Sequence, residues 1–176
     1  GREISYAEAQ ARANQIANAL IAEGIAPGTR VAFLAKNCAE YAIFYYGAAK
    51  AAAVPVPLNF RLAPPEWSYI VNDAGAELLF ARGALVDAID PIRGELKSVK
   101  RCLALEAPGR AGWDDYEAWV ARQPTSTPAR EVDANDDVYQ MYTSGTTGRP
   151  KGAVIQHRAV AENVGQLSSI APISAG

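Results

Sequence analysis

Arg-Val-Ala-Phe-Leu-Ala, at residues 30–35, is the stretch of sequence that most constrains the fold. After the first residue, every side chain in this short run is apolar. A strand with one face in water alternates polar and apolar residues, whereas a strand covered on both faces is apolar throughout. The run therefore predicts a buried strand of a parallel sheet, with helices above and below it.

The residues before this strand have the pattern of an amphipathic helix. Ser5 and Glu8 have the spacing of a capping box, in which each side chain accepts a hydrogen bond from the backbone N–H of the other. Gly24 supplies a C-terminal stop. Apolar residues recur between them at helical spacing, at Ala9, Ala13, Ile16, Ala17 and Leu20.

A second helix and a second strand follow residues 30–35. Asn37 and Glu40 repeat the capping-box spacing. The next residues, 41–52, are apolar almost all round and predict a buried helix. Residues 54–59 can then return as a strand.

The alternation of helices and strands continues to residue 122. Further strands are expected at residues 77–82 and 101–105, and further helices at residues 64–73, 84–96 and 113–122. Gly75 would end the first of these helices, and Pro91 would interrupt the second. Asp114 and Asp115 would occupy the first turn of the third, near its positive end.

This order of elements predicts the fold class. Residues 123–130 contain two prolines and three hydroxyl residues, which is typical of a surface connection. Strands that alternate with helices indicate an α/β fold. We expect a doubly wound, mostly parallel sheet with helices on both faces, in one globular unit.

Composition favours small-molecule chemistry. The 176 residues are 49% hydrophobic and 20% charged, and their net charge of −2 gives no basic footprint for nucleic acid or an anionic membrane. Cys38 and Cys102 lie far apart in apolar segments without metal-ligand spacing, so we expect a reduced, cytoplasmic setting. No integral membrane segment is expected, because Lys50, Pro55 and Pro57 interrupt the longest apolar run.

A predicted buried strand at residues 138–142 leads into the segment that carries the chemistry. This segment reads Thr143-Ser144-Gly145-Thr146-Thr147-Gly148-Arg149-Pro150-Lys151-Gly152. Gly145, Gly148 and Gly152 allow positive φ and remove side-chain bulk, so backbone N–H groups can closely approach an anion. Four hydroxyls add donors, and the Lys151 ammonium, after the restricting Pro150, can act as a point charge on phosphate oxygens. The segment predicts a loop that binds a polyphosphate.

Two other interpretations of this loop are less favourable. A flexible linker has a similar composition, but the order of the glycines, hydroxyls, proline and lysine favours a specific site. A Walker-type loop requires a lysine directly after the second glycine of Gly-x-x-x-x-Gly-Lys-Ser/Thr. Lys151 instead follows Pro150 and precedes Gly152, which disfavours an ordinary nucleoside triphosphatase.

Residues 142–152 resemble the signature phosphate loop of the adenylate-forming superfamily, which includes acyl-CoA synthetases, luciferases and peptide-synthetase adenylation domains. The resemblance spans nearly the whole chain. Upstream segments that look like landmarks of this family are Gly28-Thr29-Arg30-Val31-Ala32, Asn37 with Glu40, Gly47-Ala48-Ala49-Lys50, and Val56-Pro57-Leu58-Asn59 with Arg61-Leu62. Asn59-Phe60-Arg61-Leu62 is more similar to acyl-CoA synthetases than to amino-acid adenylation domains. Residues 50–53 depart from the family, which commonly has a glycine there.

What the resemblance implies is an AMP-forming acid–thiol ligase. A carboxylate, expected to be a fatty or aromatic acid, would attack the α-phosphorus of ATP, and the acyl adenylate would pass its acyl group to CoA. Mg²⁺ would screen the phosphates, without an obvious dedicated ligand in this chain. Residues expected to bind the nucleotide are Thr143, Ser144, Gly145, Thr146, Thr147, Gly148 and Lys151, with Lys151 also the catalytic residue.

The resemblance also implies that the chain is an N-terminal fragment. Residues 1–176 would be the N-terminal portion of an adenylation domain, without the rest of that domain and the C-terminal lid domain. We expect little or no turnover by such a piece. Three points stay open: transfer to a carrier-protein thiol instead of CoA, a non-catalytic phosphate-binding or interaction domain, and a homodimer.

Other conspicuous residues are expected to be structural. His157, the only histidine, is expected to pack or cap rather than to catalyse. An aromatic stripe at helical spacing is more typical of core than of an acyl pocket. The stripe consists of Tyr41, Phe44 and Tyr45. Interface or core positions are expected for Trp67, Trp113 and Trp119. Arg149 is expected to face solvent.

Overall fold

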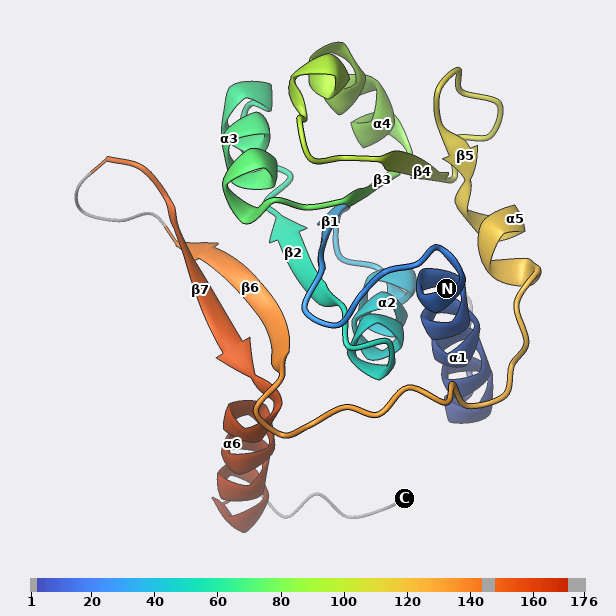
Figure 1. Ribbon diagram of the computed structural model, residues 1–176, viewed down its shortest axis with the longest axis vertical. Coiled ribbons are helices and arrows are strands. Elements are labelled where there is room, and N and C mark those ends of the chain that lie inside the picture. The colour runs from blue at the N-terminus through green and yellow to red at the C-terminus, as the bar shows by residue number, and fades with distance from the viewer. Residues whose placement is uncertain (1–2, 144–147, 171–176) are drawn as a thin grey trace.

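A five-stranded parallel sheet forms the centre of the computed structural model, which describes residues 3–143 and 148–170 (Figure 1). The strand order is β2-β1-β3-β4-β5, and every neighbouring pair is parallel. The strands are β1 (Arg30–Leu34), β2 (Val54–Leu58), β3 (Leu78–Arg82), β4 (Arg101–Leu105) and β5 (Asp114–Asp115). The predicted parallel sheet is confirmed.

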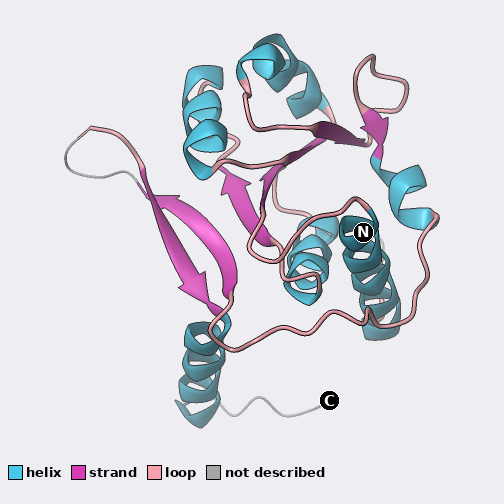
Figure 2. Ribbon diagram, viewed as in Figure 1, coloured by secondary structure: helices cyan, strands magenta, loops and turns pink. Residues whose placement is uncertain are grey.

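Helices cover both faces of this sheet, as expected for a doubly wound fold (Figure 2). One face packs against α1 (Tyr6–Ala22), α2 (Ala39–Lys50) and α5 (Tyr116–Ala121). The other face packs against α3 (Pro64–Ala74), α4 (Ala84–Ile89) and the 3-10 helix η1 (Asp90–Glu95). The helix expected at residues 84–96 is thus interrupted at Pro91, where α4 gives way to η1.

The burial of β1 explains its apolar sequence. Val31 and Phe33 belong to the apolar cluster with α1, α2 and α5, whereas Ala32 and Leu34 belong to the cluster on the opposite face. Successive side chains of a strand point to opposite faces, so an apolar residue is needed at every position. Burying each of the larger side chains stabilises the fold by about 1.5–3 kcal/mol.

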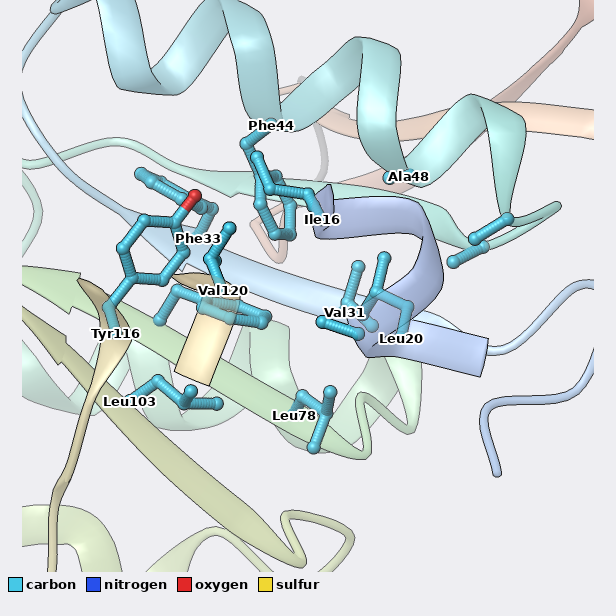
Figure 3. Close-up of a cluster of buried hydrophobic side chains, with 14 of the residues drawn as sticks. Ile16, Leu20, Val31, Phe33, Phe44, Ala48, Leu78, Leu103, Tyr116 and Val120 are labelled. Atoms are coloured by element: carbon cyan, nitrogen blue, oxygen red, sulfur yellow. The ribbon is translucent and has the colours of Figure 1, made fainter. Parts of the chain in front are cut away.

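Aromatic rings fill the layer between the sheet and α2 (Figure 3). The Phe33 and Phe44 ring centroids are 4.7 Å apart, and Phe80 lies 4.6 Å from Phe44. Gly47 lets α1 and α2 approach closely, because a Cβ at this position would lie 2.6 Å from Cγ2 of Ile16. The two helices therefore join the sheet in one continuous core.

The start of α1 agrees with the sequence, but the start of α2 does not. The Glu8 N–H donates to Ser5 Oγ at 3.2 Å, and the Ser5 N–H donates to the Glu8 carboxylate at 2.8 Å. The capping box expected at Asn37 and Glu40 is wrong, because the residue that precedes α2 is Cys38 and its side chain caps nothing. Nor is α2 buried all round, since 68% of Tyr46 is exposed.

Asp114 and Asp115 do not lie in the first turn of a helix, so that expectation is also wrong. They form β5, and only Asp115 has a helical role: as the N-cap of α5 it accepts a hydrogen bond from the Ala118 N–H at 2.6 Å. Asp114 instead accepts a hydrogen bond from Arg101 Nε at 2.7 Å. Pairing with the neighbouring strand β4 outweighs the favourable helix-dipole position.

The chain then returns across the molecule along an exposed connection, as expected for residues 123–130. Amide side chains of α1 hold it: Asn14 Nδ2 donates to the Thr125 carbonyl at 2.8 Å, and Asn18 Nδ2 donates to the Pro124 carbonyl at 3.0 Å. Arg130 donates to the Ala51 carbonyl at 3.0 Å, directly after α2. The connection leads from the β5 edge of the sheet to the β2 edge.

An antiparallel hairpin follows beside β2. It consists of β6 (Asp137–Thr143) and β7 (Lys151–Gln156), and α6 (His157–Ile170) continues from it. The strand expected at residues 138–142 therefore exists, but it lies outside the five-stranded sheet and only Gln140 in it is buried. The expectation of a buried strand is wrong, because β6 belongs to a two-stranded sheet and most of its residues stay partly exposed, although Tyr139 contacts α2 and Tyr142 contacts α3. Sequence reasoning did not find β7 or α6.

Candidate phosphate-binding site

The hairpin brings the two ends of the proposed phosphate loop together. Thr143, the last residue of β6, pairs with Lys151, the first residue of β7. The end of the hairpin where Thr143 and Lys151 pair lies away from α6 (Figure 1). Thr143 and Lys151 therefore lie side by side at this end, with Gly148 three residues before Lys151. Ser144, Gly145, Thr146 and Thr147 lie outside the described residues.

Lys151 is placed to present its charge at the exit of this loop. Lys151 is exposed to solvent. Within residues 3–143 and 148–170, no carboxylate forms an ion pair with its ammonium. An ammonium of this kind has its three N–H donors available for an anion.

Two glycines of the motif have different physical roles. Gly148 has a φ of +109°, which side chains rarely adopt, so its glycine is required by the backbone. Gly152 has no positive φ and lies in β7, opposite Tyr142. A Cβ at Gly152 would lie 2.3 Å from Gln140 Nε2 and 3.0 Å from Tyr142 Cζ, so glycine is required there by space. Of the two roles expected of Gly152, the positive φ is wrong, whereas the need to avoid side-chain bulk is confirmed.

A chain of polar contacts joins β6 to the main body. Arg30 Nε donates to Gln140 Oε1 at 3.0 Å, and Gln140 Nε2 donates to the Tyr142 hydroxyl at 3.1 Å. The Tyr142 hydroxyl in turn donates to Asp73 Oδ2 at 2.6 Å. Burial, followed by the hydrogen bond to the Asp73 carboxylate, raises the pKa of Tyr142 above its usual value. Its hydroxyl therefore keeps its proton and acts as a donor.

The other side of the loop also contacts the main body. The Tyr69 hydroxyl of α3 donates to the Pro150 carbonyl at 3.2 Å. The Arg149 guanidinium carbon lies 5.5 Å from the centre of the Tyr69 ring, within the range of a cation–π contact. Arg149 is exposed as expected, but it also has this partner. Sequence reasoning missed Tyr69 and Asp73, because no local pattern marks a residue that contacts a loop so distant in sequence.

His157 lies at the opposite end of β7 from Lys151. The two residues are six steps apart along the extended chain, or roughly 20 Å. The His157 N–H donates to the Asp136 carbonyl at 3.1 Å, at the start of α6. The backbone of His157 thus takes part in the join between hairpin and helix, and the structural role of its side chain stays a prediction.

The aromatic stripe of α2 is mainly packing, as expected. Phe44 is fully buried, and Tyr41 packs edge-on against Phe33 with ring centroids 4.7 Å apart. Tyr45 lies 6.2 Å from Tyr139 of β6, and burial raises the pKa of Tyr45 to about 12. The tryptophans expected at interface or core positions, Trp67, Trp113 and Trp119, are all buried.

The described residues contain neither a cluster of metal-ligating side chains nor a helix that could span a membrane. No group of three or more His, Cys, Asp or Glu side chains in them could hold a metal ion. None of the helices in the same ranges combines the length and apolarity that crossing a bilayer requires.

Known proteins share both this sequence and this fold. The family model for AMP-binding enzymes matches residues 1–174. The long-chain-fatty-acid–CoA ligase FadD13 of Mycobacterium tuberculosis is 39% identical over 161 residues, which cover 89% of this chain and 30% of FadD13. The fatty acid–[acyl-carrier-protein] ligase ScoC of Streptomyces coeruleorubidus is 38% identical over 162 residues, which cover 90% of this chain and 29% of ScoC.

A solved structure is similar to this chain in fold as well as in sequence. The anthranilate CoA ligase AuaEII, in complex with anthranoyl-AMP, matches with a TM-score of 0.84 and 32% identity over 89% of this chain and 30% of AuaEII. The chain thus spans about 30% of the length of the relatives that it matches. The chain belongs to the AMP-binding enzymes, the adenylate-forming superfamily that residues 142–152 resemble.

Proposed function

We propose that residues 1–176 belong to an enzyme that activates a carboxylic acid with ATP and transfers the acyl group to CoA. In the first step, a carboxylate oxygen forms a bond to the α-phosphorus of ATP, and the bond from that phosphorus to pyrophosphate breaks. In the second step, a thiol sulfur forms a bond to the acyl carbon, and AMP leaves. The observation that supports this proposal best is an exposed lysine beside Thr143, where a Gly/Thr/Ser loop rejoins its hairpin.

The loop suits the β- and γ-phosphates of ATP. Lys151 would neutralise charge on the departing pyrophosphate, and fixed donors aimed at developing charge are a major source of catalysis. The other residues that we assign to nucleotide binding are Thr143, Ser144, Gly145, Thr146, Thr147 and Gly148. Mg²⁺ would enter with the nucleotide and screen its phosphates.

This assignment makes residues 1–176 one portion of a larger catalytic unit. We propose that the adenylation domain continues beyond these residues and that a C-terminal lid domain completes the site. The 30% coverage of FadD13 supports this division. The isolated chain is then expected to catalyse little or no ATP–pyrophosphate exchange. A rate close to that of the complete enzyme would contradict the division.

The relatives support candidates for the acid and for the acceptor. FadD13 supports a fatty acid and CoA, and AuaEII supports an aromatic acid and CoA. ScoC supports a second candidate, in which the acyl group passes to a carrier-protein thiol. Incubating the complete enzyme with ATP, an acid and either thiol distinguishes the two acceptors. Both cysteines are unpaired, which supports a reduced, cytoplasmic setting.

Replacement of Lys151 tests the catalytic assignment. Lys151→Ala in the complete enzyme should lower the rate of ATP–pyrophosphate exchange by about 100-fold or more, because removing one stabilising donor from developing charge has an effect of this size. Lys97→Ala, which removes another exposed lysine from a different part of the chain, is the matched control and should leave the rate unchanged. If the folded Lys151→Ala enzyme catalysed ATP–pyrophosphate exchange at the wild-type rate, the catalytic role proposed for this loop would be wrong.

A further inference from the structure

Helix α3 contacts the hairpin on both sides of the phosphate loop. Tyr142 lies two residues before Ser144, and its hydroxyl donates to Asp73 Oδ2 at 2.6 Å. Pro150 lies directly before Lys151, and its carbonyl accepts a hydrogen bond from the Tyr69 hydroxyl at 3.2 Å. The segments entering and leaving the loop are thus bound to the same helix.

The two contacting residues of α3 share one face of the helix. Tyr69 and Asp73 are four residues apart, and residues at this spacing are neighbours on a helix surface. Arg149 adds a third contact to this face, because its guanidinium lies over the Tyr69 ring. The face therefore presents a hydroxyl, a ring and a carboxylate to the hairpin.

The remaining faces of α3 are fixed in the main body. Trp67, Ile70 and Val71 are buried in the apolar cluster beneath the helix. Asn72 accepts a hydrogen bond from the Lys97 N–H at 2.8 Å and donates to the Glu95 carbonyl at 2.9 Å. A helix held in this way is a rigid support for the loop.

We propose that α3 braces the phosphate loop, with Tyr69 and Asp73 as positioning residues for adenylation. The inference rests on the function proposed above. A glycine-rich segment has many conformations, and binding must offset the entropy that is lost when it becomes ordered. Fixing both ends lowers this cost and keeps Lys151 directed at the phosphates. Neither residue needs to touch the substrate.

The first test measures ATP–pyrophosphate exchange by the complete enzyme. Asp73→Ala and Tyr69→Phe should each raise the KM for ATP by about five- to tenfold, which is the size expected for the loss of one hydrogen bond. The KM for the carboxylate should stay the same. Asp73→Asn retains an oxygen that accepts from Tyr142, so it should restore most of the affinity for ATP.

A matched control separates positioning from stability. Asn72→Ala removes three hydrogen bonds from the same helix, with Ser68, Glu95 and Lys97, and none of these partners belongs to the hairpin. It should lower the thermal midpoint of unfolding and leave the KM for ATP unchanged. Tyr69→Phe removes a single hydroxyl, so it provides the measurement even if Asp73→Ala does not fold.

The outcomes distinguish this inference from the proposed function. If Lys151→Ala abolishes exchange while folded Tyr69→Phe and Asp73→Ala keep the wild-type KM for ATP, then α3 only stabilises the fold and the brace is wrong. If Lys151→Ala leaves exchange intact, then the proposed function itself fails. A raised KM for ATP in both α3 variants, with rescue by Asp73→Asn, supports the brace.

Discussion

The five-stranded sheet and the β6–β7 hairpin are held in place by different forces. Four strands of the sheet are almost entirely buried, with apolar side chains from helices on both faces. In contrast, β7 is exposed over nearly its whole length. Met141 and Val154 in the hairpin are 47% and 40% exposed, although both are apolar. The hairpin is joined to the main body by polar contacts from Arg30, Tyr69 and Asp73, together with the ring contact between Tyr45 and Tyr139.

The difference places the proposed chemistry on the less stable region. Apolar burial is non-directional and proportional to area, so the sheet and its helices gain most of the folding free energy. A two-stranded hairpin is only marginally stable in water, and a few directed contacts can therefore decide its position. Loops that bind ligands are often taken from such regions.

The largest effect is expected in the aromatic core of the main body. Phe80 contacts Phe44 and Trp119, with ring centroids 4.6 and 5.6 Å away. Phe80→Ala should lower the free energy of unfolding by about 3–5 kcal/mol, because it leaves a cavity in a close-packed core. Urea denaturation measures the change. Tyr46→Ala is the control, since it removes an aromatic ring that is 68% exposed and should cost little. Equal losses in the two variants would refute the division into core and surface.

An intermediate effect, confined to the hairpin, is expected for Gly152→Ala. The new Cβ would force Gln140 away from its position and disturb its contact with Tyr142, at about 1–3 kcal/mol. Hydrogen exchange should show faster opening of β6 and β7 amides, with β1 and β3 amides unchanged. Gly165→Ala in α6 is the matched control, because nothing lies within 4 Å of its Cβ. If exchange accelerates equally in the five-stranded sheet, the two regions unfold as one.

The smallest effect is expected on the free energy of unfolding at alkaline pH, and it arises from Cys102 in the main body. Burial in β4 raises the pKa of the Cys102 thiol from 9.0 to about 11. Between these values the unfolded chain loses a proton that the folded chain retains, so the free energy of unfolding falls as pH rises. The thiol contributes its full stabilisation below pH 9, and about 1 kcal/mol of it should be lost by pH 10.

Urea titrations at pH 8 and pH 10 measure this loss. Cys102→Ala should reduce the difference between the two pH values by about 1 kcal/mol, whatever its effect on stability at pH 8. Cys38→Ala should reduce it less, because Cys38 is only partly buried. An unchanged pH difference in Cys102→Ala would show that the thiol is not the group responsible.

Much of the fold was readable from local pattern. The apolar run at residues 30–35 predicted a buried parallel strand, and β1 occupies it with both faces covered. Ser5 and Glu8 predicted the start of α1, because a capping box involves only residues three apart. The failures at α2 and α5 are also local. The sequence patterns around Asn37 and Asp114 fit a helix start, but strand pairing and packing moved the actual boundaries by one to three residues.

The order of residues 143–152 by itself determined the family, since glycines, hydroxyls and a lysine at fixed spacing form a recognisable unit wherever the chain carries them. Only the tertiary structure decided that β6 pairs with β7, that Gly152 is needed for space, and that Tyr69 and Asp73 reach the loop. The contacts of Tyr69 with Pro150 and of Asp73 with Tyr142 span 81 and 69 positions of sequence, respectively. Periodicity and capping act over a few residues, so they carry no information on which distant side chains the sheet brings within hydrogen-bonding distance.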